Sequence, residues 1–200
     1  VSISLSLTTG AGTLAGTTTQ LTDGSGLATF NDISVNLSGS KNITASSGGL
    51  SSAFSTAFTI TSAAATQLVF IQQPTSAIAN TALSPAVTVQ IRDNFGNNVL
   101  SPGVSVNMAI SSGTGALGGT TVQPTNASGV ATFNNLSINL TGIKVLTASS
   151  TGLSSAVSDA FTITVGGATQ ILVETAADGS GNIVPSQNIV SGNSITVFAI

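Results

Sequence analysis

The sequence predicts an all-β protein built from consecutive antiparallel β-sandwiches, on three observations. Apolar and polar residues alternate with a period of two, as where Val87, Val89 and Ile91 alternate with Thr88 and Gln90. Clusters of Gly, Asn, Asp and Ser separate the alternating runs, and a long internal repeat covers most of the chain. Because alternation gives each strand one buried and one solvated face, it is typical of antiparallel sheets.

One repeat contains seven predicted strands. Turn signals such as those at 93–97 and 126–129 lie between them. We expect the strands near residues 66–72, 86–92, 104–111, 120–124, 130–140, 143–150 and 156–164. Short strands at this density, with no helical periodicity, are typical of a β-sandwich.

The internal repeat defines the domain organisation. Residues 25–61 and 128–164 align without a gap at an offset of 103 residues, with 26 identities in 37 positions. This length fits an independently folding domain better than a solenoid unit, which runs about 20–50 residues. We predict the C-terminal part of one repeat at 1–61 (the first repeat), a complete repeat at 62–164 (the middle repeat) and the N-terminal part of a third at 165–200 (the third repeat).

Four segments of the middle repeat resemble a known family when they are taken together. They are Thr-Gln-Leu-Val-Phe at 66–70, the Asp-x-x-Gly-Asn turn at 93–97, Gly-x-Ala-Thr-Phe at 129–133 and Phe-Thr-Ile-Thr at 161–164. This combination resembles the bacterial Ig-like repeats of very large extracellular surface proteins and adhesins. The resemblance extends into both partial repeats. It implies tandem Ig-like β-sandwiches that serve as a spacer or stalk at the cell surface, and it implies no enzymatic activity.

The composition excludes most classes of active site. The chain has no His and no Cys, so it lacks the usual ligands of zinc, haem, iron–sulfur and copper sites and the usual base of a nucleophile pair. Three basic residues are too few to bind a nucleic-acid backbone, and six acidic residues offer no credible pair for glycoside chemistry. No apolar run approaches the roughly 18 residues that cross a bilayer. We predict no catalytic, cofactor-binding or metal-binding residues, no nucleic-acid partner and no membrane span in this segment.

Two turns offer oxygen ligands as calcium loops do. In one, Asp178, Ser180 and Asn182 stand at alternate positions; in the other, Asp93 is accompanied by Asn94, Asn97 and Asn98. Each offers a single carboxylate, which is too few for firm calcium binding, so we interpret both as ordinary turns. The turn at Asp23 is interpreted in the same way, because Asn126 occupies its position in the middle repeat.

Lys41 and Lys144 occupy equivalent positions and share the inward parity of their strands. A buried lysine near an asparagine and an acid would be able to form an internal isopeptide crosslink, which the loss of one ammonia per bond from the intact mass would reveal. The alternative is a lysine at the strand edge whose stem packs while its ammonium group reaches solvent, and we favour this interpretation.

These observations favour a structural function. Strand surfaces rich in Thr, Ser and Asn are polar without charge, so they hydrate well and are insensitive to salt. The shortage of charged residues at strand edges suits lateral association. We predict a spacer or assembly unit of an extracellular fibre, sheath or stalk, whose partners are neighbouring repeats or copies of itself. The alternative is an adhesin segment that binds a surface receptor through loops near 93–102 and 112–119.

The partial repeats leave two arrangements open. Residues 168–200 would supply the two strands that 1–61 lacks, so that one copy would complete the next by strand complementation. Alternatively, one continuous longer chain supplies these strands in cis. We expect the second arrangement, because the repeat period already provides the missing strands.

Overall fold

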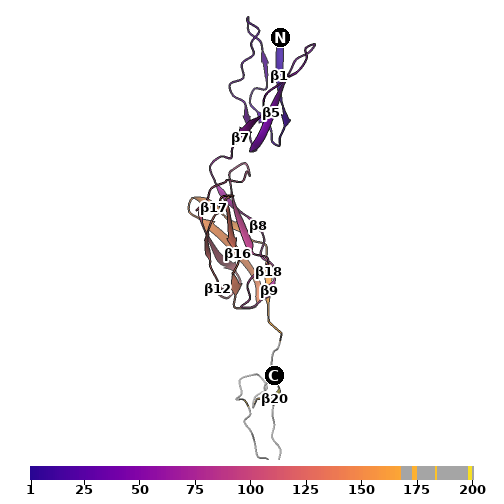
Figure 1. The fold of residues 1–200 in the computed structure, drawn as a ribbon. Coiled ribbons are helices and arrows are strands. Elements are labelled where there is room, and N and C mark those ends of the chain that lie inside the picture. The colour runs from indigo at the N-terminus through magenta and orange to yellow at the C-terminus, as the bar shows by residue number, and fades with distance from the viewer. Residues whose placement is uncertain (168–172, 175–182, 184–197, 200) are drawn as a thin grey trace, which may run out of the picture. The chain divides into compact units, whose positions relative to one another are not determined.

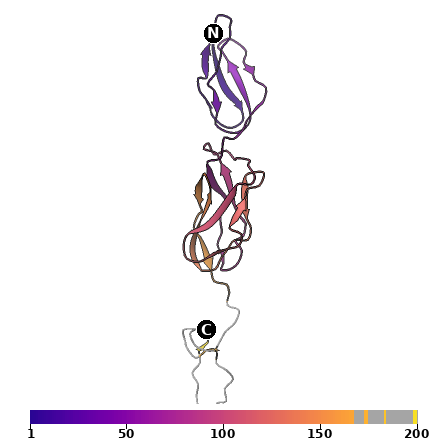
Figure 2. The ribbon, with the colours of Figure 1, turned by 90° about the vertical axis from the view of Figure 1, so that its left-hand side faces the viewer.

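The computed structural model describes residues 1–167, 173–174, 183 and 198–199. The chain divides into two compact units, Val1–Thr164 and Val165–Ile200. The regular secondary structure of the described residues consists of β-strands alone (Figures 1 and 2). That part contains no helix with the length and apolar character needed to cross a bilayer.

The middle repeat consists of two antiparallel layers. In one layer β11 lies between β13 and β16, and β16 also pairs with β17; in the other, β10 lies between β8 and β14. A single parallel pair, Ser154 of β17 with Gln67 of β8, links the two layers. The strands are β8 (Gln67–Gln72), β9 (Ala77–Ile78), β10 (Val87–Arg92), β11 (Ser105–Ser112), β12 (Leu117–Gly118), β13 (Val122–Pro124), β14 (Val130–Phe133), β15 (Ser137–Ile138), β16 (Gly142–Ser150), β17 (Leu153–Val157) and β18 (Phe161–Thr164).

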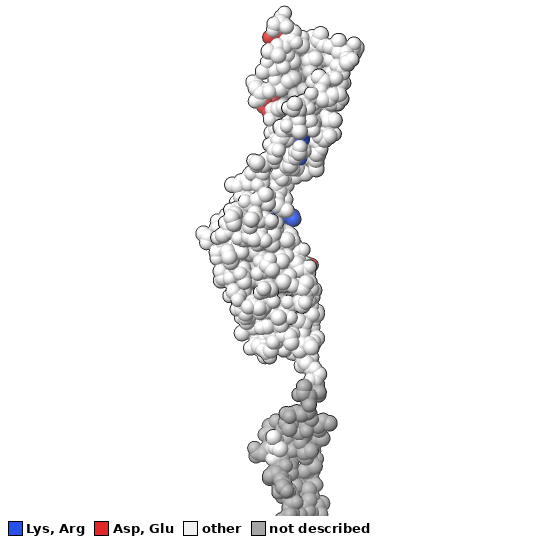
Figure 3. Space-filling view, in the orientation of Figure 1, with Lys and Arg blue, Asp and Glu red and all other residues white. Residues whose placement is uncertain are grey.

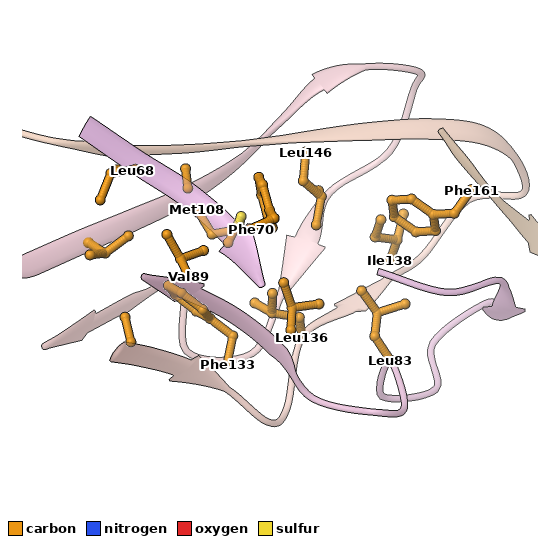
Figure 4. Close-up of a cluster of buried hydrophobic side chains, with 14 of the residues drawn as sticks. Leu68, Phe70, Leu83, Val89, Met108, Phe133, Leu136, Ile138, Leu146 and Phe161 are labelled. Carbon is orange, nitrogen blue, oxygen red and sulfur yellow. The ribbon is translucent and has the colours of Figure 1, made fainter. Parts of the chain in front are cut away.

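The core of the middle repeat lies between these layers, on the inward parity that the alternation predicts. Val89 and Phe133 extend from one layer toward Met108 and Leu146 of the other (Figure 4). Val89, Phe133 and Leu146 are completely buried. The prediction of an all-β sandwich is therefore confirmed.

Two of the seven predicted strands divide into shorter ones. Between β14 and β15 the carbonyl of Leu136 accepts a hydrogen bond from the N–H of Leu83 at 2.7 Å, and β15 then pairs with β12 instead of extending the β14–β10 ladder. Between β17 and β18 the hydroxyl of Ser158 accepts the N–H of Leu146 at 2.9 Å, in place of a backbone carbonyl. After this interruption, β18 pairs with β16 on one side and with β9 on the other.

The first repeat has the same strand pairing as the matching part of the middle repeat. β1 pairs with β3 and β5, and β5 also pairs with β6 and β7, as β11 pairs with β13 and β16 and as β16 pairs with β17 and β18. Residues 1–61 contain no counterpart of β8 and β10. The strands are β1 (Ser2–Thr9), β2 (Leu14–Ala15), β3 (Thr19–Leu21), β4 (Ser34–Val35), β5 (Gly39–Ser46), β6 (Ala53–Phe54) and β7 (Phe58–Ile60).

The unit Val165–Ile200 contains one described strand pair. β19 (Val173–Glu174) and β20 (Phe198–Ala199) are antiparallel, with Val173 opposite Ala199. The turn at Asp178 lies outside the described residues.

Candidate functional site

The candidate site is the junction between the first and middle repeats, within the unit Val1–Thr164. Its central element is the turn at 93–97, which follows β10 directly. Asp93 is completely buried and Asn97 is 8% exposed, which is unusual for polar residues in a turn. Buried polar groups of this kind are stable only with hydrogen-bond partners, so their partners define the site.

Three turns among the described residues share one hydrogen-bonding pattern, in which a side-chain oxygen accepts the N–H groups two and four residues later. Asp93 Oδ1 accepts those of Phe95 and Asn97, each at 2.9 Å. Asp23 and Asn126 accept the corresponding pairs in the first and middle repeats. The pattern is an Asx-type turn, for which Asp and Asn serve equally well.

Asp93 differs from the other two turn residues because its second oxygen also has partners. Oδ2 accepts the N–H of Ala63 at 2.9 Å and the carboxamide Nδ2 of Asn97 at 2.8 Å. Burial raises the pKa of Asp93, but the hydrogen bonds from Asn97, Ala63 and Phe95 outweigh it and hold the pKa below its ordinary value. The carboxylate is thus fixed as an anion between the turn and the linker that joins the repeats.

Asn97 carries the hydrogen bonds across the junction. Its Nδ2 donates to the carbonyl of Asn36 at 2.9 Å, and its Oδ1 accepts the N–H of Ser38 at 2.9 Å. With the bond to Asp93, both hydrogens of the carboxamide and one acceptor position of its oxygen are used. One side chain of the middle repeat therefore pairs with two backbone groups of the first.

The ammonium group of Lys41 bonds to the same residue, Ser38, whose N–H donates to Asn97. Its Nζ donates to the carbonyl of Ser38 at 3.0 Å, and the equivalent Lys144 donates to Thr141 at 2.8 Å. Both lysines are only 1% exposed, so the interpretation of a strand-edge lysine with a solvated head is wrong. The reason is local: the stem of Lys144 lies so close to Gly113 that a Cβ there would be 2.8 Å from Cδ. Among the described residues, the hydrogen-bond partner of each ammonium group is a backbone carbonyl rather than the carboxyl or carboxamide group that an isopeptide crosslink needs.

The junction thus joins two buried charges of opposite sign through neutral groups. Lys41 bonds to Ser38, Ser38 bonds to Asn97, and Asn97 bonds to Asp93. Buried hydrogen-bond chains of this kind polarise one another and fix a single arrangement when every member has a partner. We expect this network to fix how the two repeats join.

A pocket of about 640 Å³ adjoins the network, and an exposed Leu100 forms part of its wall. Most of the visible surface of the described residues is uncharged, and the blue basic atoms that can be seen lie near the junction (Figure 3). In the part of the chain that the structure describes, no three His, Cys, Asp or Glu side chains come together as a metal site would require. The pocket is lined by Ser38, Gly39, Thr59, Ile60, Thr61, Ser62, Ala63, Ala64, Asn98, Val99 and Leu100.

Asp93, Asn97 and the two lysines are candidates from the sequence, but nothing in the sequence places them together. Asn36, Ser38 and Ala63 were not predicted, and they take part through backbone atoms. One signal was present in the sequence. The turn position of Asn97 is occupied by Leu27 and Val130 in the two other turns, so a polar side chain there needs a partner elsewhere.

Comparison with known proteins gives an Ig-like match for the middle repeat. Residues 64–149 match the family model described as SMCHD1 Ig-like domain 6. The middle repeat is therefore similar to an Ig-like domain, and its two-layered strand order is that of a β-sandwich. No curated protein sequence matches the chain.

Similar solved structures include proteins of different functions. The D00-D0 domain of intimin is 22% identical over 62% of this chain and 64% of that chain, with a TM-score of 0.41. The adhesin InvE of Yersinia pseudotuberculosis is 17% identical over 82% and 49%, with a TM-score of 0.37. A β-glucuronidase of Bacteroides uniformis is 15% identical over 63% and 16%, also with a TM-score of 0.37. In each case the match spans less than two thirds of the length of the other chain, and none of these functions is carried over to this one.

Proposed function

We propose that this chain is part of an extracellular structural protein in which consecutive Ig-like units act as a spacer. The single observation that carries the proposal is the buried network at the junction. Asn97 and Asp93 of the middle repeat bond to Asn36 and Ser38 of the first repeat and to Ala63 of the linker. A spacer must transmit orientation from one unit to the next, and directional hydrogen bonds made by the buried side chains of Asp93 and Asn97 are suited to that role.

The surface chemistry supports the same proposal. Charged residues make up 4% of the chain, and among those whose burial the structure describes, Lys41, Asp93 and Lys144 are buried. A surface of Ser, Thr and Asn has little charge for salt to screen, so its interactions would change little with ionic strength. This property suits a protein that faces a variable external medium.

The adhesin alternative relies on the loops near 93–102 and 112–119. In the first of these loops Asp93 and Asn97 are buried and bonded within the junction, so they are not free to contact a receptor. In the second, residues 112–116 are exposed, so burial weakens the alternative at the first loop only. We therefore propose the spacer function ahead of receptor binding.

Residual dipolar couplings of the full chain in a weakly aligned medium test the proposal. If the repeats act as a spacer, amides of β1 and β5 and amides of β11 and β16 fit one common alignment tensor. Asn97→Ala then separates the two tensors, while the couplings within each repeat still fit its own structure. Two independent tensors in the unsubstituted chain would contradict the spacer function.

A further inference from the structure

Two surfaces of the unit Val1–Thr164 are equivalent by sequence. Residues 36–41, which hold the turn at 93–97, form the proximal surface, and residues 139–144, at an offset of 103, form the distal surface. Their backbones have the same conformation, since φ is 110° at Gly39 and 106° at Gly142. The turn at 93–97 lies on the proximal surface only.

The side chains of the two surfaces are also positioned alike. Asn36 and Asn139 each accept one backbone N–H through Oδ1, at 2.7 Å in both cases. Lys41 and Lys144 each donate from Nζ to the carbonyl three residues earlier, at 3.0 and 2.8 Å. The distal surface therefore already has the conformation that the proximal surface has in contact with the turn.

Exposure distinguishes the two surfaces. Asn36, Leu37 and Ser38 are half-buried beneath the turn of the middle repeat, whereas residues 139–141 are exposed. The apolar Leu140 at the centre of the distal surface is 50% exposed. Its counterpart, Leu37, is partly covered.

Charge indicates what the distal surface would bind. On the proximal side, the buried Lys41 is connected through Ser38 and Asn97 to the buried carboxylate of Asp93. On the distal side, the equally buried Lys144 bonds to the carbonyl of Thr141, and no described carboxylate connects to it in this way. An acidic turn would complete the same arrangement.

We propose that the distal surface is a docking surface for the Asp-x-x-x-Asn turn of another Ig-like unit. In this contact the asparagine of the turn donates to the carbonyl of Asn139 and accepts the N–H of Thr141. The aspartate of the turn holds that asparagine, as Asp93 holds Asn97. The inference deepens the proposed spacer function and depends on it for its biological meaning, although the contact itself is tested separately.

The test uses the full chain with a second copy of residues 62–164 inserted between Thr164 and Val165. Segmental ¹⁵N labelling of the original residues 1–164 makes the amides of Ser38 and Thr141 visible without overlap from the copy. In the unmodified chain, the Thr141 amide is expected to exchange rapidly with solvent. In the extended chain, its exchange is expected to slow by at least about tenfold, toward that of Ser38.

The matched control carries Asn97→Ala in the inserted copy alone. It is expected to restore rapid exchange at Thr141 while the Ser38 amide stays protected and the core amides of both copies stay protected. An unchanged Thr141 amide beside a protected Ser38 amide would overturn the inference and leave the spacer function standing. If neither amide were protected, both the docking inference and the proposed spacer function would be overturned. Protection at Thr141 that survives the substitution would overturn the assignment to the asparagine.

Discussion

Phe133 is completely buried in the middle repeat, whereas its counterpart Phe30 in the first repeat is only half-buried. The same difference separates Leu146 from Ile43. The local conformations nevertheless agree, because Gly129 and Gly26 have φ values of 73° and 83° in the turns that precede the two phenylalanines. Turns and ladders are thus determined within residues 1–61, but burial requires a second layer.

The second layer explains the difference. In the middle repeat, β8 and β10 contribute Phe70, Val89 and Ile91 to the core and pair with β17 and β14. Residues 1–61 contain no counterpart of these strands, and within these residues the same inward side chains are only partly covered. Lys41 is the exception: it is as deeply buried as Lys144, because its cover comes from neighbouring turns and not from the second layer.

Truncating the equivalent phenylalanines, Phe133 and Phe30, is expected to give the largest difference in the free energy of unfolding. Phe133→Ala removes a fully enclosed ring and is expected to lower the free energy of unfolding by about 3–5 kcal/mol. Phe30→Ala is expected to cost less than half as much, because its ring is partly solvated already. Urea unfolding followed by hydrogen exchange of peptides from each repeat separates the two effects. Equal losses would show that Phe30 is enclosed in solution.

Exchanging aspartate for asparagine compares the junction with an ordinary turn. Asp93→Asn keeps one oxygen for the turn but points an NH₂ group toward the N–H of Ala63 and the Nδ2 of Asn97. The unpaired donors are expected to cost about 1–3 kcal/mol. Asp23→Asn is the matched control and is expected to change stability by less than about 0.5 kcal/mol, because Asn126 already fills this position in the middle repeat. Similar losses from both substitutions, measured by denaturant unfolding, would argue against a special role for Asp93.

Acid is expected to weaken the junction by protonating Asp93, with a smaller effect on stability than the substitutions above. Because hydrogen bonds hold the pKa of Asp93 below its ordinary value of 3.8, its stabilisation is complete above that value and is lost as the pH falls through the lowered pKa. Hydrogen exchange of the Ala63 amide, corrected for the intrinsic pH dependence, should therefore lose protection below about pH 3.8. In the Asp93→Asn chain the Ala63 amide lacks this acceptor and is expected to exchange rapidly at every pH. A loss of protection centred near neutral pH would contradict the assignment to Asp93.

The sequence predicted the sandwich because alternation reports burial directly: Val87, Val89 and Ile91 are all completely buried. Internal repetition placed Lys41 and Lys144 at equivalent positions, and their inward parity was read correctly. Whether their ammonium groups are buried or solvated depends on the path of the turns around Gly10 and Gly113, which the side-chain pattern does not indicate.

The contacts at the junction were harder to predict from the sequence than the sandwich was. Asn97 reaches backbone groups 59 and 61 residues away, and every residue has such groups whatever its side chain. The pattern of the turn was visible, but its partner was not. Comparison of Asn97 with Leu27 and Val130 at the same turn position was the one feature that would have indicated a contact beyond the turn.

Hydrogen exchange of the Ser38 amide in the full chain, before and after Asn97→Ala, tests the junction most directly. The Asx turn needs only the backbone N–H at position 97, so the turn is expected to persist. If Asn97 joins the two repeats, the Ser38 amide is protected in the unsubstituted chain and exchanges at least about tenfold faster after the substitution, while amides of β10 and β16 keep their protection. An unchanged Ser38 amide would contradict the claim that Asn97 joins the two repeats.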